Sequence, residues 1–399
     1  MKISIISEGY FPEISGVTVS LHKRLEYLSA WGHRVQVFAP DYSALSHLYP
    51  NYKDHVGEIL PGITVHPFES IPYYVDYTRD PRPFSFQKLE AKISEFAPHI
   101  LHVECPERLF MGFVSRPGIR LARKLKIPAS AIYHTNYLSY ADDYKEQVRW
   151  LGIPGMIYLL KKVFVWVYNS YDVLMVASPD VSNYLRAWGV KNIHQAAYNG
   201  VDLEQFFPAE SVSIENGHVN FLYVGRLTAD KGIRTLLQAC NLVYEQLPNA
   251  TFTFIGGGPE AAMLNQWAET HPRGKILGRI PYAEMGEHLR QAHILVTAST
   301  KEQRPLTLLE ATRAGLPIIG PASGGVKEII RHEISGLLVP PNDAVALAEA
   351  MTRIANDPRL YQAFRKATLQ TSQNQSWEAS TKEMLNTWER LTRGEKPAD

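Results

Sequence analysis

The segment Val219–Gly232, VNFLYVGRLTADKG, carries the pattern that decides the fold. Apolar, β-branched and aromatic residues predict a buried strand at Phe221–Val224, which the next glycine ends. Apolar residues then recur at helical spacing and predict a helix at Ile233–Leu247. A strand, a short loop flanked by glycines and a helix form the unit from which helix-covered parallel sheets are built.

The same unit recurs down to Ala355. Further strands are predicted at Thr251–Ile255, Lys275–Ile280, Ile294–Ser299, Pro317–Gly320 and Leu337–Val339. Helices are predicted at Glu260–Thr270, Tyr282–Ala292, Pro305–Ala314, Val326–His332 and Ala344–Ala355. This alternation is typical of an open, doubly wound sheet, in which ligands bind beyond the carboxyl ends of the strands.

A first series of the same kind precedes this segment. Its strands are predicted at Lys2–Ser7, Arg34–Phe38, Ile100–Val103, Ala129–His134, Val173–Ala177 and His194–Ala197. The Pro- and Tyr-rich stretch Pro61–Phe86 has few helical cues, and we expect it to be a surface excursion. The polar, aperiodic segment Phe206–His218 is the predicted linker. The chain is therefore predicted to be an α/β protein of two doubly wound, Rossmann-like domains.

The length of the chain favours more than one domain. Its composition argues against a nucleic-acid-binding, membrane-spanning or disulfide-rich protein. One hydrophobic core rarely exceeds about 250–300 residues, and the chain has 399. Its 41 Lys and Arg against 40 Asp and Glu give a charge of +1, which offers no global attraction for nucleic acid. The sequence has no long apolar span or signal-peptide core, and Cys105 and Cys240 allow no disulfide framework. We therefore expect a cytoplasmic protein.

Two cations follow the strand that opens the second series. Arg226 and Lys231 stand in a loop flanked by Gly225 and Gly232. Such a loop suits a phosphate group, because the glycines let the backbone approach and the side chains supply charge-assisted hydrogen bonds. The alternative is a solvated loop in which the cations pair with Asp230.

Two carboxylates, Glu302 and Glu310, bracket the segment QRPLTLL. Pro305 is predicted to be the first helical residue, which leaves the amides of Leu306 and Thr307 free to face an anion. Each carboxylate can accept two hydroxyl groups, a contact that orients sugars and ribose diols. The alternative is a loop acid and a helix acid without a ligand.

A glycine-rich turn, Gly256–Ala261, matches the dinucleotide fingerprint G-x-G-x-x-A. Pro259 interrupts it, it does not lie in a first strand–helix unit, and no acid ends the next strand. We interpret it as a tight turn with Gly257 at the ligand side, and keep a nicotinamide-dependent dehydrogenase as a remote alternative.

Two candidates lie in the first series. Gly16 follows the first strand and opens a helix, where a glycine permits close approach of a ligand. His134 ends a strand in Tyr133-His134-Thr135, again at the carboxyl edge, although a lone histidine is often structural. No P-loop, nucleophile elbow or Asp-x-Asp pair occurs, so the motifs indicate no cofactor and no acidic clamp for a metal–diphosphate.

Together these motifs resemble the retaining GT-B glycosyltransferases of family 4. The matching segments run in order along nearly the whole chain: Tyr10–Val17, Tyr133–Thr135, Asn199–Phe207, Tyr223–Gly232, Ile255–Pro259, Glu302–Gly315, Gly324–Pro340 and Ser376-Trp377. The N-terminal half is most similar to the subgroup of glycolipid synthases and alpha-mannosyltransferases. Pro305 and Ser15 stand where the family commonly has glycine.

The resemblance implies a fold. Residues 1–205 would form an acceptor-binding domain facing a donor-binding domain, residues 206–379, across a cleft. Residues 380–399 would return to the first domain through a last helix near Ser380–Arg393.

The resemblance also implies roles. Arg226, Lys231 and the amides of Leu306 and Thr307 would hold the donor's diphosphate without a metal. Ribose would bind at Glu310, the transferred sugar at Glu302, and Gly16 and His134 would contact the donor and the reacting centre. The resemblance assigns no covalent nucleophile.

The acceptor is indicated by a basic segment. Six bases and no acid occur between Arg108 and Ala141: Arg108, Arg116, Arg120, Arg123, Lys124 and Lys126. The aromatic stretch Ile157–Val167, around Lys161 and Lys162, suits an interfacial helix. Each base contributes about 1 kcal/mol at an anionic membrane. The alternative is an ordinary sheet-facing helix with lysines whose stems lie along it.

The predicted function is therefore a retaining hexosyltransferase. It would use a UDP- or GDP-linked sugar and a hydroxyl of a membrane glycolipid or diacylglycerol-type lipid, as a peripheral enzyme at the cytoplasmic face. A soluble or polysaccharide acceptor is the alternative. A non-catalytic nucleotide-sugar-binding protein is disfavoured because Arg226, Lys231, Glu302 and Glu310 are all present.

Overall fold

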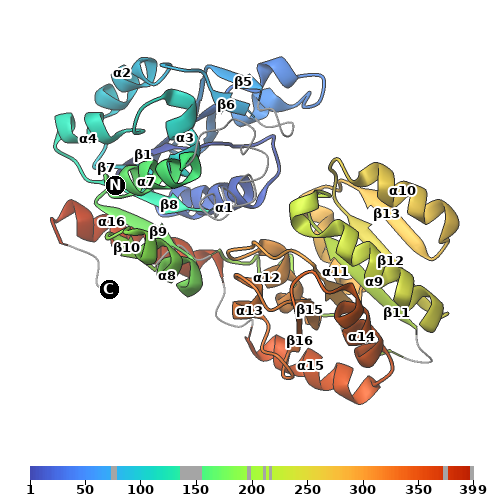
Figure 1. Ribbon diagram of the computed structural model, residues 1–399. Helices are drawn as coiled ribbons and strands as arrows, with labels where there is room; N and C mark the ends of the chain where they lie inside the picture. The colour runs from blue at the N-terminus through green and yellow to red at the C-terminus, as the bar shows by residue number, and fades with distance from the viewer. Residues whose placement is uncertain are drawn as a thin grey trace. The chain divides into compact units, whose positions relative to one another are not determined.

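The chain forms two compact units in a computed structural model, Met1–Tyr198 with Trp377–Asp399, and Asn199–Ser376 (Figure 1). The structure describes residues 1–72, 79–134, 155–195, 199–209, 213–214, 218–371 and 376–395. The second unit begins at Asn199 rather than at 206, because Val201 and Phe206 are buried in its core.

Unit 2 contains a parallel six-stranded sheet in the order β13-β12-β11-β14-β15-β16. Its strands are β11 Val219–Val224, β12 Ala250–Ile255, β13 Gly274–Gly278, β14 Ile294–Val296, β15 Ile318–Pro321 and β16 Gly336–Val339. They overlap the predicted strands, with ends that differ by no more than three residues. The strand order reverses between β11 and β14, which pair at the centre. Ligands of doubly wound sheets bind at such a switch point.

Helices cover both faces of this sheet. They are α9 Ile233–Gln246, α10 Ala261–Thr270, α11 Met285–Gln291, α12 Leu306–Arg313, α13 Val326–Ile329, α14 Ala344–Ala355 and α15 Pro358–Thr371. Adjacent residues of β11 point to opposite faces, so Phe221 joins the core under α9 and α14. Leu222 joins the core under α11 and α12.

Unit 1 contains an eight-stranded sheet in the order β10-β9-β8-β7-β1-β2-β4-β3. Its strands are β1 Lys2–Ile6, β2 Arg34–Pro40, β3 Gly57–Leu60, β4 Ile63–Phe68, β7 Ile100–Glu104, β8 Ala129–Tyr133, β9 Val173–Val176 and β10 Ile193–His194. All pairs are parallel except that of β3 with β4. The last predicted strand is partly borne out at Ile193–His194; its residues 196–197 lie outside the described ranges.

The prediction that Pro61–Phe86 is a surface excursion is wrong. β4 lies within it, pairs with β2 and buries Ile63 and Val65. The strand β4 was not predicted because prolines are rare in strands and this stretch is rich in proline. Pro67 lies beyond the end of β3, where β4 is an edge and a missing N–H is tolerated. The short strands β5 Ser70–Pro72 and β6 Arg79–Pro81 form a separate antiparallel pair.

The helices of unit 1 include one from the end of the chain. They are α1 Gly16–Ala30, α2 Gln87–Phe96, α3 Pro106–Phe113, α4 Ile119–Leu125, α7 Met156–Tyr168, α8 Pro179–Trp188 and α16 Trp377–Thr392. In Figure 1, α16 lies with the N-terminal elements. Its Trp388 and Leu391 share a buried cluster with Leu21 and Leu25 of α1, which anchors the returning segment.

Candidate active site

Lys231 and Glu302 meet at the switch point of the unit 2 sheet. Lys231 ends the 3₁₀ turn Ala229–Lys231 after β11, and Glu302 lies in the loop after β14. Lys231 Nζ is 2.6 Å from Glu302 Oε1, and the two side chains are only 14% and 19% exposed. The structure thus brings together two residues that the sequence assigned to one site.

Arg226 lies in the same loop but is more accessible. Its guanidinium is 3.6 Å from Asp230 Oδ2, the pairing that the solvated-loop alternative expected. The Arg226 side chain is 54% exposed. An exposed ion pair of this kind contributes little to stability, about 0–1 kcal/mol, so an anion can compete for Arg226.

The glycine-rich turn Gly256–Ala261 packs against the loop that carries Arg226. Gly256 has φ 140°, and a Cβ there would overlap the carbonyl oxygen of Gly225. Leu227 N donates to Gly257 O at 3.0 Å, and Glu260 N donates to Leu227 O at 2.9 Å. The turn therefore holds the backbone beside Arg226.

The N-terminus of α12 presents free amides. Pro305 is the N-cap, with φ −67° and ψ 126°, and the helix begins at Leu306, one residue later than predicted. Its carbonyl oxygen accepts from Leu308 N at 3.2 Å and Leu309 N at 3.4 Å. Among the described residues, none accepts from the amides of Leu306 and Thr307. These N–H groups carry the positive end of the helix dipole.

Gln303, next to Glu302, is a site residue that the sequence reasoning missed. Its side chain is buried, and neither amide atom bonds to any residue within the described ranges. A buried amide left unsatisfied costs about 1–3 kcal/mol. The Gln303 amide therefore needs a polar partner beyond the described residues, which either a water molecule or a ligand can supply.

Glu310 lies on α12 and is almost fully buried. Tyr282 Oη donates to Glu310 Oε1 at 2.7 Å. Burial raises the pKa of Glu310 to about 7, although the hydrogen bond from Tyr282 opposes the shift. A carboxylate that lacks water around it is suited to accept ligand hydroxyls. Nothing in the sequence spacing pointed to Tyr282.

In unit 1, His134 directly follows β8 and bonds through Nε2 to Glu104 Oε2 at the end of β7. Arg24 NH2 of α1 lies 3.0 Å from Glu104 Oε1, and His102 Nε2 lies 3.3 Å from the same oxygen. Burial acts to raise the pKa of Glu104, but the Arg24 guanidinium and the imidazoles of His102 and His134, which lie against the carboxylate, outweigh it and hold that pKa well below its usual range. These partners of His134 were not predicted from the sequence, although a carboxylate at the end of the buried strand ILHVE was a usable signal.

Gly16 is the first residue of α1 and is exposed. Ser15 caps this helix, since its Oγ accepts from Thr18 N at 3.3 Å and its own N–H donates to Thr18 Oγ1 at 2.9 Å. Ser15 therefore starts the helix through its side chain. The ligand contacts assigned to Gly16, Gly257 and His134 remain predictions.

The basic segment from Arg108 to Ala141 carries less unbalanced positive charge than its sequence suggested. Arg108 Nε is 2.9 Å from Asp80 Oδ1, and Arg108 NH1 is 3.4 Å from Glu8 Oε2. Arg120 NH2 is 2.8 Å from Glu90 Oε1 of α2. Acids distant in sequence thus balance two of the six bases, and residues 135–141 lie outside the described ranges.

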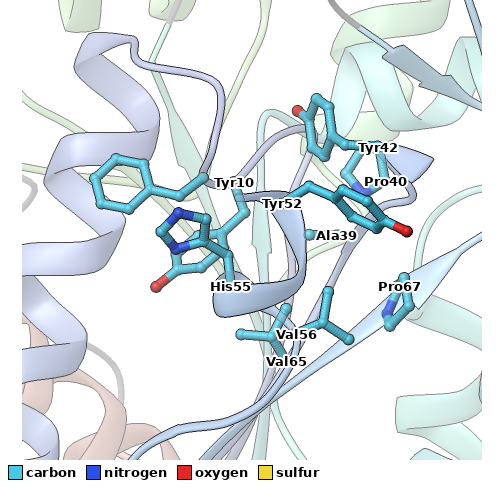
Figure 2. Close-up of a pocket in the computed structure, with 10 residues that line it drawn as sticks. Tyr10, Ala39, Pro40, Tyr42, Tyr52, His55, Val56, Val65 and Pro67 are labelled. Carbon is cyan, nitrogen blue, oxygen red and sulfur yellow. The ribbon is translucent and has the colours of Figure 1, made fainter. Parts of the chain in front are cut away.

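A small aromatic cavity lies at the ends of β2 and β4 in unit 1. Figure 2 shows it among the side chains of Tyr10, Tyr42, Tyr52 and His55. Its volume is ≈ 10 Å³, room for about one water molecule. A cavity of this size is too small for a sugar or a nucleotide.

The described part of the chain contains neither a metal-binding group of side chains nor a helix that could span a membrane. No three His, Cys, Asp or Glu side chains there are grouped to hold a metal. No helix described there is long and apolar enough to span a bilayer.

Two family models match the chain, "Glycosyltransferase Family 4" over residues 14–205 and "Glycosyl transferases group 1" over residues 209–371. The chain is 26% identical over 399 residues to the GDP-mannose-dependent alpha-mannosyltransferase of Mycobacterium tuberculosis, covering 98% of this chain and 96% of that protein. It is 28% identical over 340 residues to the alpha-monoglucosyldiacylglycerol synthase of Acholeplasma laidlawii, covering 80% of each.

Solved structures share the fold. Sucrose-phosphate synthase from Thermosynechococcus elongatus matches with a TM-score of 0.76 at 22% identity, covering 98% of this chain and 99% of that one. HepE from Anabaena in complex with UDP-glucose matches with a TM-score of 0.73 at 16% identity and the same coverage. These likenesses confirm the predicted pair of Rossmann-like domains.

Proposed function

The chain belongs to the GT-B glycosyltransferases of family 4, and we propose that it transfers a hexose, with retention, from a nucleoside-diphosphate sugar to a hydroxyl of a membrane glycolipid or diacylglycerol-type lipid. Among its relatives are a GDP-mannose-dependent alpha-mannosyltransferase and an alpha-monoglucosyldiacylglycerol synthase. The observation that carries the proposal is the Lys231–Glu302 pair at the switch point of the unit 2 sheet.

We assign the diphosphate to Arg226, Lys231 and the free amides of Leu306 and Thr307. Cations and a helix N-terminus stabilise the negative charge that develops on the departing nucleoside diphosphate. This assignment requires no metal ion. The orphaned amide of Gln303 supports a polar ligand at the same loop.

We assign the sugar hydroxyls to Glu302 and the ribose hydroxyls to Glu310. The Lys231 ammonium group has three N–H donors. It can therefore keep its ion pair with Glu302 and still donate a hydrogen bond to a phosphate oxygen. The ion pair would then link the leaving group to the transferred sugar. The incoming hydroxyl would attack the anomeric carbon on the face that the nucleoside diphosphate vacates and pass its proton to the departing phosphate oxygen, which gives retention.

A lipid acceptor is supported by the exposed face of α7. Tyr158, Leu159 and Trp166 are exposed on this helix, and Met111 is exposed on the neighbouring helix α3. Bases lie against two of these rings: the Arg116 guanidinium is 4.2 Å from the Trp166 centroid, and Lys162 Nζ is 5.3 Å from that of Tyr158. Aromatic rings beside cations suit the interface of an anionic membrane. We therefore propose a peripheral enzyme at the cytoplasmic membrane face.

The test is transfer from a panel of UDP- and GDP-hexoses to diacylglycerol glycolipids in anionic vesicles or to soluble sugars. We expect product with lipid acceptors, retained anomeric configuration and activity that falls with salt. Transfer to soluble sugars alone would reject the lipid acceptor but keep the enzyme class.

Vesicle binding is measured in parallel. The double variant Tyr158→Ser/Leu159→Ser should lose co-sedimentation with anionic vesicles, while Val345→Ser, a matched exposed apolar residue in unit 2, should not. Equal recovery of both variants with the vesicles would exclude docking through α7.

A further inference from the structure

Four polar side chains meet inside unit 1, where β7 and β8 end beside α1. We call Arg24, His102, Glu104 and His134 the Glu104 cluster. Arg24 and His102 both reach Glu104 Oε1, at 3.0 Å and 3.3 Å, while His134 Nε2 bonds Oε2. Glu104 and His102 are fully buried, and His134 is the most accessible member, at 9% of its side chain.

The cluster is held from several elements. Arg24 Nε donates to Ser20 O at 3.1 Å, and Arg24 NH1 contacts Met384 Sδ of α16 at 3.4 Å. His102 Nδ1 is 2.8 Å from Ser130 Oγ, and its ring centroid is 5.0 Å from that of Trp388. These supports hold Arg24 and His102 in place, and both lie within ion-pair distance of Glu104 Oε1 without an aligned hydrogen bond. The aligned hydrogen bond of the carboxylate is the one that joins Oε2 to His134 Nε2.

The charges in the cluster balance without a charged histidine. The Arg24 guanidinium matches the charge of the Glu104 carboxylate, and such a buried ion pair is costly to break. Burial lowers the pKa of His102 and favours its neutral form. Glu104 therefore needs no second cation, and His134 can donate its Nε2–H to the second carboxylate oxygen.

We propose that Glu104 is a positioning residue that holds His134 in the Nε2–H tautomer and leaves Nδ1 to accept a hydrogen bond from a ligand hydroxyl. No residue in the described ranges bonds Nδ1. A carboxylate that orients an imidazole through one nitrogen fixes the role of the other. The assignment of that hydroxyl to the transferred sugar rests on the proposed function.

This arrangement suits glycosyl transfer. The anomeric carbon gains positive charge as the leaving group departs, as in glycoside hydrolysis. A neutral acceptor nitrogen orients a sugar hydroxyl without placing a second positive charge beside that centre. A purely structural ion pair of Arg24 and Glu104 would not require His134 to keep one tautomer.

The direct test is the nitrogen-15 NMR spectrum of the histidine side chains in the intact protein. The His134 signals are assigned by their loss in His134→Asn. We expect a protonated Nε2 and an unprotonated Nδ1 at pH 7.5, with Nδ1 shifting when nucleotide sugar is added. A protonated Nδ1, or one unmoved by saturating donor, would overturn the proposal without any Glu104 variant.

Kinetics supply the second test. Glu104→Gln should lower kcat about tenfold or more, as loss of an orienting partner does, while the donor KM and the affinity for nucleoside diphosphate, whose proposed ligands lie in unit 2, change little. Glu104→Asp should recover part of kcat. Glu107→Gln removes another buried carboxyl from the same edge and should leave the His134 signals unchanged.

The outcomes separate the two proposals. If no nucleotide sugar supports transfer, the proposed function fails, and the NMR spectrum still decides the tautomer. If transfer occurs and folded Glu104→Gln keeps full kcat, the positioning role alone is rejected.

Discussion

Lys231 Nζ lies 2.6 Å from Glu302 Oε1, so two residues assigned to different parts of a donor bind each other in the free protein. Both side chains are mostly buried, which makes their attraction stronger than that of a surface pair. A diphosphate must therefore share Lys231 with Glu302. The next two predictions test this coupling.

Replacement of Glu302 by Gln removes the charge that competes for Lys231. Affinity for nucleoside diphosphate should stay the same or increase, while turnover of the sugar donor should fall because the contact with the sugar is weakened. Titration calorimetry and initial rates measure the two effects. A loss of nucleoside-diphosphate affinity would contradict the separate roles of the two residues.

Replacement of Lys231 by Ala should weaken nucleoside-diphosphate binding by about 1.5–3 kcal/mol, the contribution of a hydrogen bond to a charged group. Arg234→Ala is the matched control, because this exposed cation lies next to the loop at the start of α9. Wild-type activity should survive EDTA. Inactivation by EDTA that Mg²⁺ or Mn²⁺ reverses would exclude the metal-free assignment.

Glu310 should make nucleotide binding depend on pH. Its pKa is raised from 4.5 to about 7, so ribose hydroxyls should be accepted better above pH 7, where the carboxylate is ionised. The dissociation constant for nucleoside diphosphate should fall as pH rises from 6 to 8, and Glu310→Gln should remove this dependence. An unchanged slope in the variant would assign the dependence to another group.

The same shift affects stability. The folded state keeps a proton on Glu310 that the unfolded state releases above pH 4.5, so this group's contribution to stability declines as pH rises towards 7. A shift of this size corresponds to about 3 kcal/mol. Denaturant titrations measure the free energy of unfolding at pH 5 and pH 8. This free energy should decrease less between the two pH values in Glu310→Gln than in the wild type.

The sequence predicts the fold of unit 2 well because its signals are local. Strand and helix periods and the glycine next to Arg226 lie within single segments. Prolines obscured β4, since Pro67 lies past the residues that pair with β3, where a missing N–H leaves no ladder hydrogen bond broken on that side. Tyr282 beside Glu310, and Arg24 beside Glu104, are contacts between distant segments that only packing determines.

The glycine turn offers a last test, because two glycines of unit 2 differ in one respect. Gly256 and Gly278 both have positive φ, 140° and 69°. A Cβ on Gly256 would overlap the carbonyl oxygen of Gly225, whereas one on Gly278 would meet nothing within 4 Å. Gly278→Ala should therefore cost only the backbone strain of about 1–2 kcal/mol. Gly256→Ala should cost more, because the loop that carries Arg226 must move.

Thermal unfolding and nucleoside-diphosphate affinity together decide this prediction. Gly256→Ala should lower both, since the displaced loop no longer presents Arg226 to the diphosphate. Gly278→Ala should lower the unfolding temperature slightly and leave the affinity unchanged. If folded Gly256→Ala binds nucleoside diphosphate as wild type does, the turn does not position the cation loop, and Arg226 is placed by its own contacts with Asp230.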